Sequence, residues 1–224
     1  MPKLLLILLA LLGTQLFSNA QEALWVVHGG YQTTSAKYTV KGIEQNTGQK
    51  SGVVAGVSLK MTFENRFYFF PTIQYSTKGY KVDLVEKTYP PSTLAINNNT
   101  TLHTIDFAPL FQFDFSYNPN HVFFRFGPVF DYTISGSETY DTLSTNGYTG
   151  TVSEKMVFKY SGYGRITASV VGHLGYQMEN GLMIFAHYNH GIGSMNNADN
   201  GPRIFHRIAG LSVGYLFGAK KQKR

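Results

Sequence analysis

The chain has 224 residues, no cysteine, and 19 lysine and arginine residues against 13 aspartate and glutamate residues, a formal net charge of +6. The absence of cysteine excludes lipoprotein anchoring, disulfide bonds and thiolate metal sites. Much of the basic excess lies in the tail KKQKR, and the remainder does not form the basic and aromatic stripe typical of nucleic-acid binding. Nucleic acid is therefore not an expected partner.

The first twenty residues have the plan of a signal peptide. A single positive charge, Lys3, precedes an apolar run over residues 4–12, and the segment ends in small residues just before Gln21. This run is about half of the roughly 20 residues that a membrane-spanning helix needs, and no other segment qualifies, so no helical anchor is expected. We expect export through a cleavable signal peptide in 1–20, one barrel domain in 21–218 and a basic C-terminal tail in 219–224.

Eight segments of the chain read as β-strands. Short turns rich in Asn and Gly separate some of them, and long polar links separate the others. Short turns at one end and long loops at the other, with an even strand number, are typical of outer-membrane barrels. The expected fold class is all-β, an eight-stranded antiparallel up-and-down transmembrane β-barrel. The predicted strands are 23–34, 51–63, 66–80, 102–116, 121–135, 158–178, 181–194 and 203–217, and the long links are 35–50, 81–101, 136–157 and 195–202.

The clearest strand is TIDFAPLFQFDF, residues 104–115. Apolar residues occupy its odd positions, four of them phenylalanine, while Thr104, Asp106, Gln112 and Asp114 lie among its even positions. Strict alternation gives a strand two chemically opposed faces, so this strand is expected to separate two different media.

Alternation does not decide which face points outward. A soluble, lipocalin-like carrier would turn the apolar face inward around a ligand. The apolar faces hold too many phenylalanine and tyrosine rings for an eight-stranded interior, whereas the opposite faces are rich in Gly, Ser and Thr. Aromatic side chains suit lipid and its interfaces, so the membrane orientation is favoured.

Charged and imidazole side chains share the parity of the inward face. Lone charges in a narrow lumen are costly, so we expect a paired, hydrogen-bonded network that plugs the barrel, with a gated ion path as the alternative. Two facing histidines could begin a metal site, but no third ligand has suitable spacing, so no metal or other cofactor is predicted. The expected lumen residues are Lys60, Asp106, Asp114, Arg125, Asp131, Arg165, His173 and His187.

The long loops and the tail are candidate contact regions. The longest link forms either a recognition surface on a rigid scaffold or only a solvated crown, and its candidate residues are Tyr140, Thr142, Tyr148, Thr149 and Thr151. The basic tail is either a disordered terminus or a contact for an acidic periplasmic partner. Arg207 is an outward residue near the loop end, where it either contacts lipopolysaccharide phosphates or snorkels toward the lipid headgroups.

Four segments of the chain carry a further resemblance: FFPTIQYSTKGYKV at 69–82, the apolar strand around Pro109, FRFGPVFDY at 124–132 and the closing hairpin at 187–217. Together they resemble the PorT-like outer-membrane β-barrel family of Bacteroidetes. The resemblance covers most of the chain behind the signal peptide and implies an outer-membrane barrel of a Gram-negative envelope. The family's namesake is an accessory protein of type IX secretion, but its N-terminal segment before the first strand has no obvious counterpart here.

The same hairpin permits a test for enzymatic function. Outer-membrane lipid A deacylases are eight-stranded barrels with a His-x-Ser pair on a late strand and an acid on the next. Here the pair reads His187-Tyr188-Asn189, and residues 203–217 contain no Asp or Glu. Without a hydroxyl nucleophile and an orienting acid, acyl transfer has no mechanism, so no catalysis is expected.

The sequence therefore predicts a monomeric outer-membrane barrel with a structural, scaffold or surface-binding role through its outer loops. The alternative is a narrow transport or type IX secretion accessory component.

Overall fold

The computed structural model describes residues 23–143, 147 and 149–218. The predicted signal peptide in 1–20, the predicted tail in 219–224 and Tyr148 lie outside the described residues. No helix in the described part of the chain is both long enough and apolar enough to cross a membrane.

Strands make up most of the described chain. β-Branched and aromatic residues with period-two alternation favour this conformation, because they pack well on a pleated surface. The elements are β1 Ala23–Val40, β2 Ile43–Glu44, β3 Asn46–Gly48, β4 Lys50–Glu64, β5 Phe67–Asp83, β6 Asn97–Asp114, β7 His121–Leu143, β8 Thr149–Lys155, β9 Ile166–Gln177, β10 Leu182–Gly191 and β11 Arg203–Leu216.

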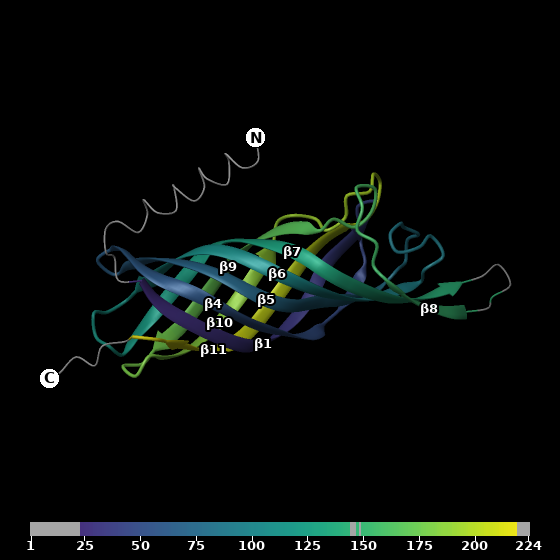
Figure 1. The fold of residues 1–224 in the computed structure, drawn as a ribbon. Helices are drawn as coiled ribbons and strands as arrows, with labels where there is room; N and C mark the ends of the chain where they lie inside the picture. Colours follow the sequence, from purple (N-terminus) through teal and green to yellow (C-terminus); the bar gives the residue numbers. More distant parts are fainter. Residues whose placement is uncertain (1–22, 144–146, 148, 219–224) are drawn as a thin grey trace, which may run out of the picture.

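The sheet closes into a barrel. Among the described residues, eight strands form the ring in the order β1, β4, β5, β6, β7, β9, β10 and β11, and β11 pairs with β1. All these pairings are antiparallel, and the closing pair extends from Val26 opposite Leu216 to Thr39 opposite Arg203. Closure pairs the two strands that would otherwise be exposed edges of the sheet. The short turns gather at one end of the barrel and the long connections at the other (Figure 1).

Three predicted loops contain more strand than expected. β1, β5, β6 and β7 extend well beyond the predicted ends, and β3 and β8 add to the sheet past the ring. The link predicted as loop 136–157 is largely a β7–β8 hairpin that projects from the long-connection end (Figure 1). The hairpin extends beyond the apolar belt of the barrel, so both of its faces meet water and both carry polar residues. The apolar–polar alternation that predicts a strand is therefore absent.

One strand start was also predicted wrongly. The sixth strand of the ring, β9, begins at Ile166 rather than at residue 158. The segment between β8 and β9 leaves the sheet, and two of its side chains, Met156 and Tyr163, are buried in an apolar cluster.

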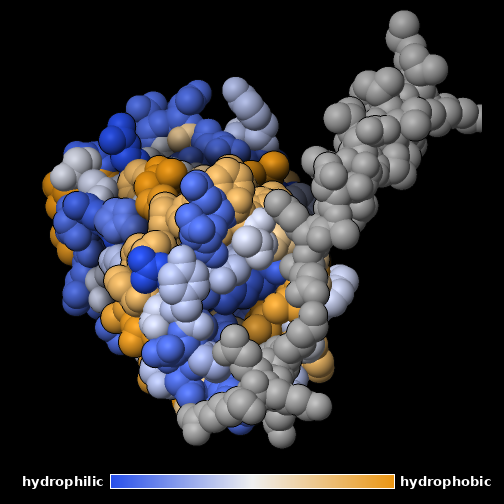
Figure 2. All heavy atoms as spheres, turned by 90° about the vertical axis from the view of Figure 1, so that its left-hand side faces the viewer, coloured by the Kyte–Doolittle hydropathy of each residue, from blue (hydrophilic) through white to orange (hydrophobic). Residues whose placement is uncertain are grey.

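The outer surface of the barrel is apolar. Exposed side chains include Val57, Phe107, Phe130 and Leu211, each on a different strand. Aromatic rings gather near the short turns, where Phe67 and Phe111 stack with 5.4 Å between ring centroids. Seen from that end, hydrophilic side chains of the turns lie beside hydrophobic ones that reach the surface (Figure 2). These rings lie on the outer surface and not in the lumen. This position agrees with a lipid-facing apolar surface and not with the inward apolar face of a soluble carrier.

Two apolar clusters lie inside the barrel. The lower cluster is nearer the short turns and includes Val26, Phe70, Leu110, Phe123, Met183 and Phe185. The upper cluster lies at the long-connection end and includes Tyr38, Tyr80, Leu102, Met156, Tyr163, Met195 and Ile204. Polar and charged side chains fill the space between and below these clusters.

Candidate functional site in the barrel lumen

A paired charge lies at the short-turn end of the lumen. Lys60 Nζ lies 2.6 Å from Asp114 Oδ2 and 3.2 Å from Gln177 Oε1, and His121 Nε2 lies 3.1 Å from the same Asp114 oxygen. These groups line an open cavity of about 520 Å³. The cavity admits solvent to this end of the barrel. Lys60 and Asp114 form an ion pair with each other there, so neither charge is left without a partner.

Arg125 lies above this pair and within the lower apolar cluster. Its guanidinium lies 3.6 Å from the centroid of Phe70, an arrangement that favours cation–π attraction. Arg125 Nε and Nη2 both donate to Gln112 Oε1, at 3.1 and 2.7 Å, and Gln112 Nε2 donates to Asp114 Oδ1 at 2.6 Å. Arg125 Nη1 lies 3.3 Å from His173 Nδ1. Arg125 thus links the charged pair to the centre of the lumen.

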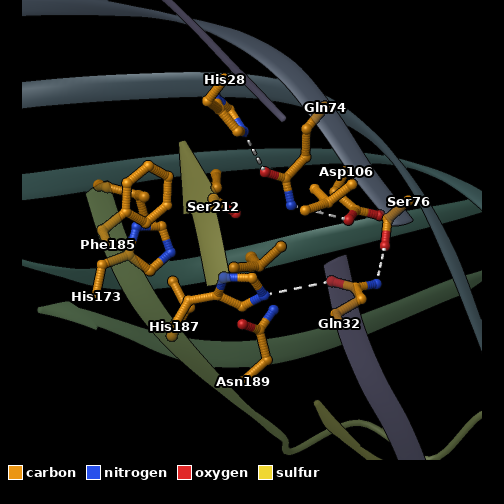
Figure 3. Close-up of a pocket in the computed structure, with 15 residues that line it drawn as sticks. His28, Gln32, Gln74, Ser76, Asp106, His173, Phe185, His187, Asn189 and Ser212 are labelled. Carbon is orange, nitrogen blue, oxygen red and sulfur yellow. Dashed lines mark hydrogen bonds between the residues drawn. The ribbon is translucent and has the colours of Figure 1, made fainter. Parts of the chain in front are cut away.

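The centre of the lumen holds the two histidines predicted to face each other. His173 and His187 are register partners on β9 and β10, with 5.8 Å between ring centroids. Gly210 leaves room for the His187 ring, because a Cβ at this position would lie 2.7 Å from Nε2. His28, a third imidazole that was not predicted as a lumen residue, lines the same cavity as these two rings, from the side of Gln74 (Figure 3).

The space between these imidazoles is small. The cavity they line has a volume of about 20 Å³, room for about one water molecule. His28 Nε2 lies 3.2 Å from Gln74 Oε1, and His187 Nε2 lies 3.4 Å from Gln32 Oε1 (Figure 3). No group of three His, Cys, Asp or Glu side chains within the described ranges is arranged to hold a metal ion. The site therefore reads as a packed polar core.

A three-residue ion cluster lies closer to the long connections. Lys78 Nζ lies 3.1 Å from Asp106 Oδ1 and 2.7 Å from Asp131 Oδ1. All three side chains are buried, and Thr104 and Thr167 each donate a hydrogen bond to one of the carboxylates. The ammonium group of Lys78 on β5 thus joins a carboxylate from β6 and a carboxylate from β7. The hydroxyl groups of Thr104 and Thr167 supply further hydrogen-bond donors to these carboxylates.

Side chains of the upper cluster close the barrel mouth. Glu138 Oε2 accepts hydrogen bonds from Tyr163 Oη at 2.8 Å and from Asn98 Nδ2 at 3.1 Å. Burial raises the pKa of Glu138, although these two donors oppose the shift. Tyr38 donates to the carbonyl oxygen of Pro90 at 3.3 Å, which ties β1 to the connection between β5 and β6.

Seven of the eight predicted lumen residues are buried in the interior. Arg165 is not among them, because β9 begins one residue later and the Arg165 side chain is exposed. Its Nη1 instead donates to the backbone carbonyls of Thr133 and Ile134. The prediction was wrong because it applied the in-and-out alternation of β9 to Arg165, which precedes the first residue of that strand.

Several interior residues were not predicted from the sequence. Lys78 shares the inward parity of Ser76 on β5, so the same alternation would have found it. Phe70, Phe123 and Phe185 also point inward, although aromatic rings were assigned to the outer face. Phe123 has the same odd parity as Arg125, which was a usable signal. Large rings fit because glycine, Gly175 for example, lies beside them.

The closing hairpin does not place a histidine of a hydrolase pair at position 187 on the lipid-facing surface. His187 points into the barrel and Tyr188 points outward. His190 is exposed on the opposite face from His187, as the alternation predicts.

Comparison with known proteins places the chain in a family. The family model for the outer membrane protein beta-barrel domain matches residues 17–197. The chain belongs to this family. It is therefore an outer-membrane β-barrel protein of a Gram-negative bacterium, and its long connections are the ones expected to face the outside of the cell.

Solved structures of small outer-membrane barrels are similar in fold. The attachment invasion locus protein Ail of Yersinia pestis is 13% identical, with 88% of this chain and 99% of that chain covered and a TM-score of 0.43. OprG of Pseudomonas aeruginosa is 10% identical, with 88% and 97% covered and a TM-score of 0.47. Neisserial surface protein A is 12% identical, with 85% and 96% covered and a TM-score of 0.42. No curated protein sequence matches the chain.

Proposed function

We propose that this protein is a closed, non-catalytic barrel that presents a binding surface outside the cell. The observation that supports this role most directly is the contrast between its two ends. The lumen is filled by apolar clusters and paired charges, while β5, β6, β7 and β8 continue as a sheet beyond the barrel. A filled lumen suits a scaffold, and a rigid projecting sheet suits recognition.

The projecting hairpin of β7 and β8 is well suited to hold a binding surface in place. Ser137 to Leu143 pair with Lys155 to Thr149 in continuous register. Tyr140 donates to Glu154 Oε1 at 2.8 Å, and Thr151 donates to Asp141 Oδ1 at 2.6 Å. These cross-strand contacts restrain side chains before a partner arrives, which lowers the entropy cost of binding.

We also propose the finer assignments made from the sequence. These are membership of the PorT-like group, a monomeric state, a signal peptide in 1–20, a barrel domain in 21–218 and a basic tail in 219–224. The alternative role, a narrow transport or type IX secretion accessory component, requires an open path or a secretion partner. In the described lumen the central cavity of about 20 Å³ favours the closed barrel.

Shortening the hairpin should abolish surface binding and leave the barrel folded. Thr139 and Ser153 are register partners, so an Asn-Gly turn that replaces residues 140–152 can join them as a two-residue hairpin. We expect the shortened protein to keep its heat-dependent electrophoretic mobility and to lose adhesion of expressing cells to host-cell or matrix-coated surfaces. The substitution Lys81→Gln, at an exposed residue of β5 that lies outside the hairpin, keeps the hairpin intact, is the control and should retain adhesion. Equal adhesion of shortened and complete protein would contradict the proposed role of the hairpin.

Reconstitution tests the closed lumen separately. Purified protein in a planar bilayer should give no stepwise conductance, because apolar side chains block both the lower and the upper part of the lumen. The double substitution Phe123→Ala with Phe185→Ala removes two rings of the lower cluster and should raise the frequency of brief openings. Steady conductance by the unaltered protein would favour the transport alternative.

A further inference from the structure

A basic patch lies on the outer face of the barrel where β10, β11 and β1 meet. Arg207 is the register partner of His190 on β10 and of Ser35 on β1. Two further outward steps bring Lys37 opposite Phe205 and Arg203 opposite Thr39. We call Lys37, His190, Arg203 and Arg207 the basic seam.

The basic seam begins where the apolar belt ends. On β11 the outward residues are Val213, Leu211 and Ala209, and Arg207 is the next one toward the outside of the cell. On β10, Tyr188 is exposed and His190 follows it. Tyrosine at the end of an apolar belt is typical of the membrane interface, so the seam lies at the level of the lipid headgroups in the outer leaflet.

Basic side chains are more numerous on the seam than on the other strands at this level. The first outward residue beyond the apolar belt is Ser51 on β4, Thr77 on β5 and Ser135 on β7, while β6 carries His103 there and β5 carries Lys81 further out. The seam, by contrast, brings four basic side chains onto three adjoining strands. Cations that merely anchor the barrel in lipid need no such grouping.

Few acidic groups compensate the seam within the described chain. Lys37 Nζ lies 3.5 Å from Glu44 Oε2, and Lys41 Nζ, in the loop that follows β1, lies 3.6 Å from Glu86 Oε2, so these two lysines are each paired with one carboxylate. Arg207 Nη1 donates only to the backbone carbonyls of Gly191 and His206, both at 3.0 Å. Among the described residues, Arg203 has neither an ion pair nor a side-chain hydrogen bond. Both guanidinium groups therefore keep N–H donors that have no partner among the described residues and that an anion could use.

A groove continues the seam outward. It has a volume of about 340 Å³ and is lined by Thr39, Lys41, Gly42, Asn200, Gly201 and Arg203. Lys41, Gly42 and Asn200 have positive φ angles of 49°, 86° and 59°, so two tight turns form its walls. A volume above about 300 Å³ suits a small organic group rather than a bare ion. Arg203 belongs both to the groove and to the seam.

We propose that the basic seam and its groove bind the phosphorylated sugar headgroup of a lipopolysaccharide molecule in the outer leaflet. Arg203 and Arg207 pair with the phosphates, since a guanidinium presents two parallel donors to a phosphate. Lys37 and Lys41 add positive charge, and the groove takes an adjoining sugar. The bound lipid covers the β1–β11 closure from outside. This site depends on the outward orientation of the long connections and not on the adhesive role of the hairpin.

The binding test uses the full-length folded protein and bisphosphorylated lipid A in mixed micelles as the probe. We expect saturable binding in native mass spectrometry, a loss of at least about tenfold in affinity for Arg203→Gln with Arg207→Gln, and little binding of dephosphorylated lipid A. Lys81→Gln with Lys155→Gln is the matched control. It removes two exposed cations from the same end of the barrel but outside the seam, and it should bind as the unaltered protein does. Heat-dependent mobility confirms that each variant is folded.

Competition experiments distinguish a lipid headgroup from free phosphate as the ligand of the site. Inorganic phosphate should displace lipid A only at far higher concentration, because it cannot use the groove. Displacement at equal concentration would overturn the lipid assignment in favour of a free-anion site. Equal affinity of the Arg203→Gln and Arg207→Gln double variant and the control would overturn the site altogether. The protein with the shortened hairpin should still bind lipid A, so failure of the adhesion role and failure of this site are separate results.

Discussion

Replacing Lys78 by methionine should lower the free energy of unfolding of the barrel by about 3–5 kcal/mol, as is typical when one partner of a buried ion pair is removed. Lys78 lies within 3.1 Å of Asp106 and 2.7 Å of Asp131, and all three are buried. Without the ammonium group, two carboxylates repel each other in an interior from which water is largely excluded.

The measurement is urea unfolding of the protein in lipid vesicles, followed by heat-dependent mobility and by the fluorescence of Trp25, the single tryptophan. The triple variant Lys78→Met, Asp106→Asn and Asp131→Asn is the matched control, because it removes the whole charge cluster and leaves neutral groups that still accept from Thr104 and Thr167. It should recover most of the lost free energy of unfolding. If the single and triple variants are equally unstable, the deficit comes from lost packing of Lys78 and not from uncompensated charge.

Replacing Leu211 by arginine should lower the free energy of unfolding in vesicles by about 2–4 kcal/mol, the cost of a charge near the bilayer midplane. Leu211 is 65% exposed on the outer face of β11, and its register partners Tyr31 and Ala186 are also outward residues. The guanidinium would enter the hydrocarbon region, where water cannot solvate it.

The same substitution at Ser135 is the control. Ser135 is an exposed residue of β7 just beyond the apolar belt, where an arginine should cost about 0–1 kcal/mol. Equal and small effects at Leu211 and Ser135 would mean that the apolar face does not contact lipid. That outcome would revive the soluble carrier, in which both positions face water.

Alternation of side chains made most of the barrel predictable. Strand segments such as 104–115 have one apolar and one polar face, and a strand places successive side chains on opposite faces. The ring of eight strands, the antiparallel order and the positions of Lys60, Asp114, Arg125 and His173 followed from this period. The same rule, applied more strictly, would have found Lys78 and Phe123.

Prediction failed where the surroundings of a strand change. Beyond the membrane both faces of β7 and β8 meet water, so no alternation distinguishes a strand from a loop there. Arg165 was assigned to the lumen because residue parity was extended past the start of β9. Backbone hydrogen bonds between neighbouring strands decide such boundaries, and these bonds leave little trace in the residue types themselves.

By itself, the sequence determined that the chain forms an amphipathic, closed all-β barrel, because period-two alternation over eight segments leaves an apolar face that only lipid can cover. The tertiary structure alone decided which side chains become neighbours. Lys78 reaches carboxylates from two neighbouring strands, Arg125 stacks on Phe70, and Arg207 and His190 come together across the last hairpin. These contacts depend on strand register, and register is set by how all the strands close into one ring.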